Sequence, residues 1–106
     1  MNKTILGACC LMLAASLPAF AGDPEAGQKK SQACVACHGP DGNSPAPDFP
    51  KIAGQHYDYL VKALKDYKSG ARKNAIMAPI VANLTQRDVE DLAAHFSSQK
   101  GLVVKY

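Results

Sequence analysis

The chain has 106 residues, with 12 lysines and arginines against 9 aspartates and glutamates and a formal net charge of +3. This excess of positive charge is too small to indicate a nucleic acid partner. A chain of this length forms one small domain, and the apolar core of such a domain is by itself only marginally stable.

Residues 1–21 have the layout of a secretory signal peptide. Lys3 gives a positively charged start, an apolar run extends from Ile5 to Leu17, and the small-residue pattern Ala19-Phe20-Ala21 follows. The run is shorter than the roughly 20 residues that span a bilayer. We therefore expect cleavage after Ala21, a mature domain over residues 22–106 and a periplasmic location, with no stable insertion into the membrane.

A lipoprotein signal is the alternative interpretation of the same segment. Leu6-Gly7-Ala8-Cys9 resembles a processing box that would leave Cys9 as a lipidated first residue. Such a box should follow the apolar run, whereas here the run comes after it. The secretory signal is therefore the interpretation that the sequence favours.

Removal of the signal leaves two cysteines, Cys34 and Cys37, and one methionine, Met77. A disulfide between two such close cysteines would close only a tiny loop and would hardly restrain the unfolded chain. Because so small a domain needs stronger support, we expect a larger stabilising group at this position.

The first part of the mature chain predicts a helix followed by a long loop. Asp23-Pro24-Glu25 combines an N-cap carboxylate, a first-turn proline and an acid near the positive helix end. We expect this helix to run from about Pro24 to the cysteines. Glycine, proline, aspartate and asparagine are too dense over residues 38–55 for a regular element.

Two further helices are predicted by apolar residues at helical spacing, over residues 56–69 and over residues 86–98. Thr85 as the N-cap of the second of these helices, with Asp88 at its N3 position, indicates a weaker version of the capping box. A loop that contains Met77 joins the two helices. No segment alternates with the period of a strand, so the predicted fold class is all-α with long loops.

The stretch "CVACHG", residues 34–39, allows three kinds of chemistry. A thioredoxin-like redox pair would sit within alternating strands and helices, which the sequence does not predict. A structural zinc site would need a second close pair of ligands, which the sequence also lacks. The remaining interpretation is Cys-x-x-Cys-His, the attachment sequence of c-type haem.

Haem attachment explains the spacing of these residues. Two thiols about one helical turn apart can add to the two vinyl groups on one side of a porphyrin, and the next residue can place its imidazole on the iron. We expect Cys34 and Cys37 to form thioethers and His38 to be an axial ligand. One covalent haem c would also supply the apolar surface that a small domain needs.

Met77 is the predicted second axial ligand. An isolated methionine is ordinarily core filler, but a low-spin haem iron needs a sixth ligand and Met77 is the one methionine that remains after processing. His56 and His95 are the alternatives. Each of them is more typical of a capping or surface histidine.

The stretch "CVACHGPDGNSPAPDFPKIAGQ" resembles the class I cytochromes c, and within them the single-haem bacterial cytochromes of the c-553 kind and one half of the dihaem cytochrome c4 family. The resemblance covers the whole mature chain. It implies the class I fold, with three main helices and long loops wrapped around one covalently bound haem. It also implies electron transfer.

The resemblance implies further roles for residues of the long loop. In class I cytochromes a loop proline carbonyl accepts a hydrogen bond from the axial histidine, and Pro47 is the best match, with Pro45 and Pro50 as alternatives. Phe49 and Ile52 would line the haem. The competing interpretation is that these residues are rigid loop punctuation and ordinary core.

The resemblance also concerns the packing of the first helix against the last. Gly27 matches the glycine at which the two helices approach closely, with Phe96 as the expected aromatic neighbour. Ser31 departs from the family pattern, because many class I members carry an aromatic residue there. The details of this helix contact are therefore open.

These inferences together predict a periplasmic electron carrier that is not an enzyme. With imidazole and thioether on the iron no coordination position is open, and the chain offers no nucleophile with a base and no paired carboxylates near the motif. Two alternatives remain: a haem c subunit of a periplasmic dehydrogenase complex, and a gas-binding or peroxidase-like haem protein.

Other redox proteins, of unknown identity, are the expected partners, bound weakly and transiently by a monomer. Six basic residues could form a docking patch for an acidic partner, or some could simply be the solvated face of a helix. They are Lys51, Lys62, Lys65, Lys68, Arg72 and Lys73. Residues 101–106 could pack on the domain or form a short partner-binding tail.

Overall fold

The computed structural model describes Gly7 and residues 22–105. Apart from Gly7, the predicted signal peptide and the lipoprotein box around Cys9 lie outside the described residues, as does Tyr106. Among the residues described, no helix is long and apolar enough to cross a membrane.

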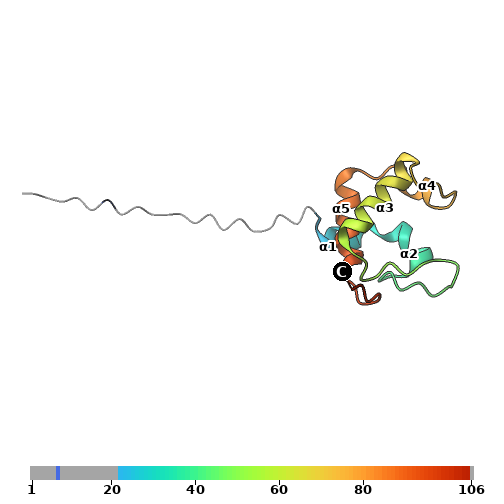
Figure 1. Cartoon of the computed structure of the whole chain (residues 1–106), viewed down its shortest axis with the longest axis horizontal. Helices are drawn as coiled ribbons and strands as arrows, with labels where there is room; N and C mark the ends of the chain where they lie inside the picture. Colours follow the sequence, from blue (N-terminus) through green and yellow to red (C-terminus); the bar gives the residue numbers. More distant parts are fainter. Residues whose placement is uncertain (1–6, 8–21, 106) are drawn as a thin grey trace, which may run out of the picture.

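The described part of the chain contains five helices, joined by loops, and no strands (Figure 1). They are α1 (Pro24–Lys30), α2 (Gln32–His38), α3 (Tyr57–Ser69), α4 (Met77–Val81) and α5 (Gln86–Ser97). The predicted all-α fold is confirmed. α1 and α5 pack against each other, and α3 packs against α5.

The prediction of one continuous first helix is wrong, because the chain breaks at Ser31 between α1 and α2. α1 begins as expected, with the Asp23 carboxylate accepting a hydrogen bond from the Glu25 amide at 3.0 Å. At the break, the buried Ser31 hydroxyl donates to the Gln28 carbonyl at 2.7 Å. A serine that binds a nearby carbonyl competes with regular helix bonding, and here a new helix starts after it.

The helices predicted farther along the chain are confirmed to within a residue. α3 follows His56 and ends at Gly70, whose positive φ of 84° forms a left-handed cap. α5 begins with the predicted capping box, in which Thr85 and Asp88 each accept from the other's backbone amide. The short helix α4, in contrast, lies where the sequence predicted only a loop.

The apolar core lies where α3 meets α5. Its buried centre consists of Leu60 from α3 with Leu92, Ala93 and Phe96 from α5. Further apolar side chains pack on this centre and stay only partly buried: Cys34, Ile52, Tyr57, Val61, Leu64 and Leu84. This is a small core with a partly uncovered apolar edge, as expected for a domain of this size.

α1 and α5 approach each other closely at Gly27. A Cβ atom at this position would lie 1.9 Å from the carbonyl oxygen of Asp91 and 2.8 Å from Cβ of His95. The predicted close approach is therefore confirmed. The nearest atoms belong to Asp91 and His95 rather than to Phe96, whose ring instead lies beside Gly42.

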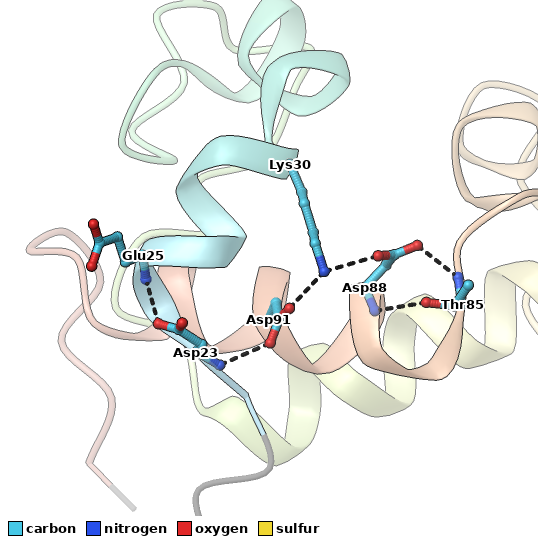
Figure 2. A network of polar contacts seen from close by, with 6 residues as sticks. All are labelled: Asp23, Glu25, Lys30, Thr85, Asp88 and Asp91. Atoms are coloured by element: carbon cyan, nitrogen blue, oxygen red, sulfur yellow. Dashed lines mark hydrogen bonds and ion pairs between the residues drawn. The ribbon is translucent and has the colours of Figure 1, made fainter.

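A polar network crosses the same contact between α1 and α5 (Figure 2). The carboxylate of Asp91, which is 2% exposed, accepts from the Asp23 amide at 2.8 Å and from Lys30 Nζ at 2.6 Å. Lys30 Nζ also lies 3.0 Å from Asp88 in the capping box of α5. The network therefore joins both ends of α1 to the first turns of α5.

We predict that Gly27→Ala destabilises the protein by about 3 kcal/mol or more, because the new methyl group meets backbone atoms that cannot move aside. Helix propensity alone predicts the opposite, a gain of roughly 1 kcal/mol. Denaturant unfolding of the holo-protein distinguishes the two. Gln28→Ala, at an exposed position of the same helix, is the control and should change stability by less than about 0.5 kcal/mol.

We also predict that the Asp91 network makes stability depend on acid pH. The hydrogen bond from Lys30, and then that from the Asp23 amide, lower the pKa of Asp91. The ionised Asp91 carboxylate contributes its full stabilisation of the folded state above the unfolded-state pKa of about 3.9. This stabilisation is lost as the pH falls through the lower folded-state pKa. Asp91→Asn should lower the urea midpoint of unfolding at neutral pH. The variant should also lose less stability than the native protein when the pH falls below about 4.

Asp48→Asn is the control for this experiment, because Asp48 is an exposed loop residue. A variant at Asp91 that kept the full acid dependence of the native protein would contradict the assignment.

Candidate functional site

Helix α2 carries the three residues of the attachment motif. Cys34 and Cys37 are three positions apart, so their side chains project from the same face of the helix. Both are free thiols and partly buried, whereas His38, the last residue of α2, is only 8% exposed. Gly39 ends the helix with a φ of 83°, a value that glycine adopts readily.

The imidazole of His38 is held by the carbonyl of Pro50, with Nδ1 2.8 Å from the oxygen. The expectation that Pro47 fills this role is wrong, and the alternative Pro50 is the residue that makes the contact. The physical reason lies in the loop: the Gly42 carbonyl accepts from the amides of Ile52 and Ala53 at 2.9 and 3.1 Å. These bonds fold the segment that follows Pro50 back towards His38.

This contact fixes the tautomer of His38. A carbonyl oxygen can only accept, so Nδ1 must carry the proton and donate it. Nε2 then holds the lone pair that a metal ion requires. The hydrogen bond at Nδ1 also makes the ring a stronger donor of electrons to such an ion. The buried end of α2 therefore presents an imidazole whose Nε2 is free of its proton and could bind a metal ion.

The cysteine environment is unlike that of a redox-active pair. Burial, followed by the neighbouring Cys37, raises the pKa of the Cys34 thiol. Reactive cysteines have lowered pKa values that favour the thiolate, so the direction of the shift argues against a thioredoxin-like site. In the described part of the chain, no group of three or more His, Cys, Asp or Glu side chains could hold a metal ion such as zinc.

The donor set and its surroundings fit a covalent haem. Two free thiols one turn apart precede an imidazole with a fixed tautomer, and Cys34 and Ile52 belong to the partly buried apolar edge of the core. Phe49, the other predicted lining residue, is also partly buried. A flat apolar macrocycle would find both its attachment points and an apolar surface here.

Met77 lies at the start of α4 and is partly buried. Its backbone amide and that of Ile76 both donate to Oδ1 of Asn74, each at 2.9 Å. Asn74 thus begins the short helix that carries Met77. Asn74 was not predicted from the sequence, although an asparagine ahead of a helix is a known capping signal. In Figure 1, α2 and α4 extend to the same side of the α1–α5 pair.

The two other histidines have different surroundings. His56 is exposed at the start of α3. His95 is 4% exposed on α5, where its Cβ lies close to Gly27 of α1, and burial lowers its pKa. His95 therefore belongs to the contact between α1 and α5.

Two thiols, an adjacent imidazole oriented through Nδ1 and an apolar edge define a site for covalently attached haem. Comparison with known proteins agrees with this class. Residues 24–100 match the cytochrome c family, and the chain belongs to it.

The chain is similar to cytochrome c4. It is 47% identical to cytochrome c4 of Pseudomonas aeruginosa over 100 residues, which cover 94% of this chain and 50% of the relative. The crystal structure of reduced recombinant cytochrome c4 from Pseudomonas stutzeri superposes with a TM-score of 0.73 at 53% identity, covering 77% of this chain and 48% of that one. The chain thus spans about half the length of these relatives.

A shorter relative is matched over its whole length. Cytochrome c-554(548) of Halomonas halodenitrificans is 45% identical over 83 residues, which cover 76% of this chain and 100% of the relative. The expected resemblance to class I cytochromes c, and to one half of cytochrome c4, is confirmed, and so is the expected fold.

Proposed function

We propose that this protein is a periplasmic electron carrier with one haem c, attached through Cys34 and Cys37 and ligated by His38 and Met77. The observation that carries the proposal is the 2.8 Å contact between His38 Nδ1 and the Pro50 carbonyl, which leaves Nε2 to the iron. The membership of the cytochrome c family supports the same conclusion.

The chain's own residues would tune the one-electron couple that a bound haem supplies. His38, whose electron donation the Pro50 carbonyl strengthens, would stabilise ferric iron, whereas the thioether of Met77 would favour the ferrous state and raise the potential. If His38 and Met77 both ligate the iron, no coordination position would be open to a substrate. Transfer of an electron is then the chemistry that remains.

Other redox proteins are the proposed partners, in brief complexes with a monomer. Two relatives are named "Thiosulfate dehydrogenase electron acceptor", and the one from Stutzerimonas stutzeri is 43% identical over 65 residues, 60% of this chain. These names support a role for this chain in accepting electrons from a dehydrogenase. The donor of this chain is a redox enzyme of that general kind.

The basic residues contribute unequally to a docking patch. Lys62 pairs with Asp66 on its own helix, and Lys68 donates to the carbonyl of Leu84. Arg72 lies over the ring of Tyr67, with 4.7 Å between its Cζ and the ring centroid. Because these three groups serve contacts within the domain, Lys51, Lys65 and Lys73 are the better candidates for steering a partner.

The axial-ligand assignment predicts a long-wavelength sulfur-to-iron band in the spectrum of the oxidised holo-protein. Met77→Leu should abolish the band and lower the reduction potential, because a thioether stabilises ferrous haem. His56→Ala and His95→Gln are matched controls at the alternative ligands and should keep the band. Absence of the band from the native protein would reject Met77 as the ligand and favour a gas-binding or peroxidase-like site.

Asn74 offers a second, milder test. Asn74→Ala removes the acceptor of two amide bonds and should weaken α4 by about 1 kcal/mol, so that added imidazole displaces Met77 at a roughly fivefold lower concentration. Asn83→Ala, at an exposed position just after the same helix, should leave the displacement unchanged. Equal imidazole titrations for the two variants would show that Asn74 has no role in holding Met77.

A further inference from the structure

The loop that carries Pro50 is held from outside by the chain that follows α5. After Ser97 the backbone turns back, and the Leu102 amide donates to the Ala53 carbonyl at 2.7 Å. The Gly54 amide donates in turn to the carbonyl of Phe96, near the end of α5, at 2.9 Å. The limb of the loop that follows Pro50 is therefore fixed to the C-terminal part of the chain.

The other limb of the loop is fixed by Asn43. Its side-chain amide donates to the Lys100 carbonyl at 2.7 Å and to the Asp41 carboxylate at 2.9 Å. Asp41 also accepts from the Asn43 backbone amide at 3.0 Å, which orients the asparagine. One short segment, residues 100–102, thus contacts both limbs of the loop.

Gly101 makes this contact possible. A Cβ atom there would lie 2.5 Å from Asn43 Oδ1, 2.7 Å from Ala53 Cβ and 2.8 Å from the Ala53 carbonyl oxygen. The segment therefore lies directly against both limbs, and no side chain larger than hydrogen fits between them without displacement. Beyond it, Val103 is 94% exposed and Val104 is 37% exposed, and the backbone hydrogen bond nearest this end of the segment is that of Leu102.

We propose that residues 100–102, with Asn43, are a positioning element for the axial histidine. By clamping the two limbs together, they hold the Pro50 carbonyl at Nδ1 of His38 and so set the donor strength of the ring. This proposal rests on the proposed function, in which His38 ligates the haem iron. Residues 100–102 of the C-terminal segment would then pack on the domain and help to set how strongly His38 donates to the haem iron.

The test compares two truncations of the holo-protein. Ending the chain after Gln99 removes both the Lys100 carbonyl and the Leu102 amide, whereas ending it after Leu102 keeps both and removes only residues 103–106. In the reduced, diamagnetic protein, NMR follows exchange of the His38 Nδ1 proton with solvent. We expect roughly tenfold faster exchange in the shorter chain, the effect of losing one or two ordinary hydrogen bonds, and native exchange in the longer one.

The reduction potential provides a second readout. A weaker hydrogen bond at Nδ1 makes the imidazole a poorer donor to ferric iron, so the potential of the shorter chain should rise. Exchange of the Leu92 and Phe96 amides in α5 reports general loosening of the domain. If the Nδ1 proton exchanges faster only in proportion to these amides, the segment has a merely structural role and the proposal is overturned.

A point substitution covers the case in which the shorter chain does not fold. Asn43→Ala removes the side-chain contact with Lys100 at a solvent-accessible position, and Asp48→Ala is the control in the same loop. Faster Nδ1 exchange in Asn43→Ala alone supports the proposal, and equal exchange in the two variants overturns it. A native protein without a sulfur-to-iron band or a reversible couple would instead reject the proposed function itself.

Discussion

The hydrogen bond from His38 Nδ1 to the Pro50 carbonyl is the interaction on which the site depends. It settles which ring nitrogen is protonated, and it holds the ring at the buried end of α2. Its partner is a backbone atom, so its geometry depends on the course of the whole loop rather than on one side chain. How strongly this imidazole could donate to a metal ion is therefore a property of the fold.

The rest of the domain supplies the rigidity that this bond requires. α1 and α5 meet so closely at Gly27 that only hydrogen fits, and the Asp91 carboxylate ties the ends of α1 to α5. Near the end of α5, the Phe96 carbonyl accepts a hydrogen bond from the Gly54 amide of the loop. The helices thus form a frame on which an irregular loop can keep one conformation.

Local sequence signals predicted the regular elements well. The bounds of α3 and α5 followed from apolar periodicity and from the Thr85 and Asp88 capping box, since both features act within a few residues of each other. The break at Ser31 was missed because a serine is compatible with a helix unless its hydroxyl finds a carbonyl, as it does at Gln28. The short helix after Asn74 was missed because one turn has no periodicity to detect.

Local sequence was enough to predict the chemistry of the site: the Cys-x-x-Cys-His spacing predicts two attachment points and a ligand, because these residues are neighbours on one helical turn. Which of three nearby prolines contacts His38 could be seen only in the folded chain. That choice depends on the Gly42 carbonyl and on the return of the chain at Leu102, contacts between residues far apart in sequence. Residues adjacent in sequence supply the reactive side chains of the site, and contacts across the fold set the orientation of the His38 ring.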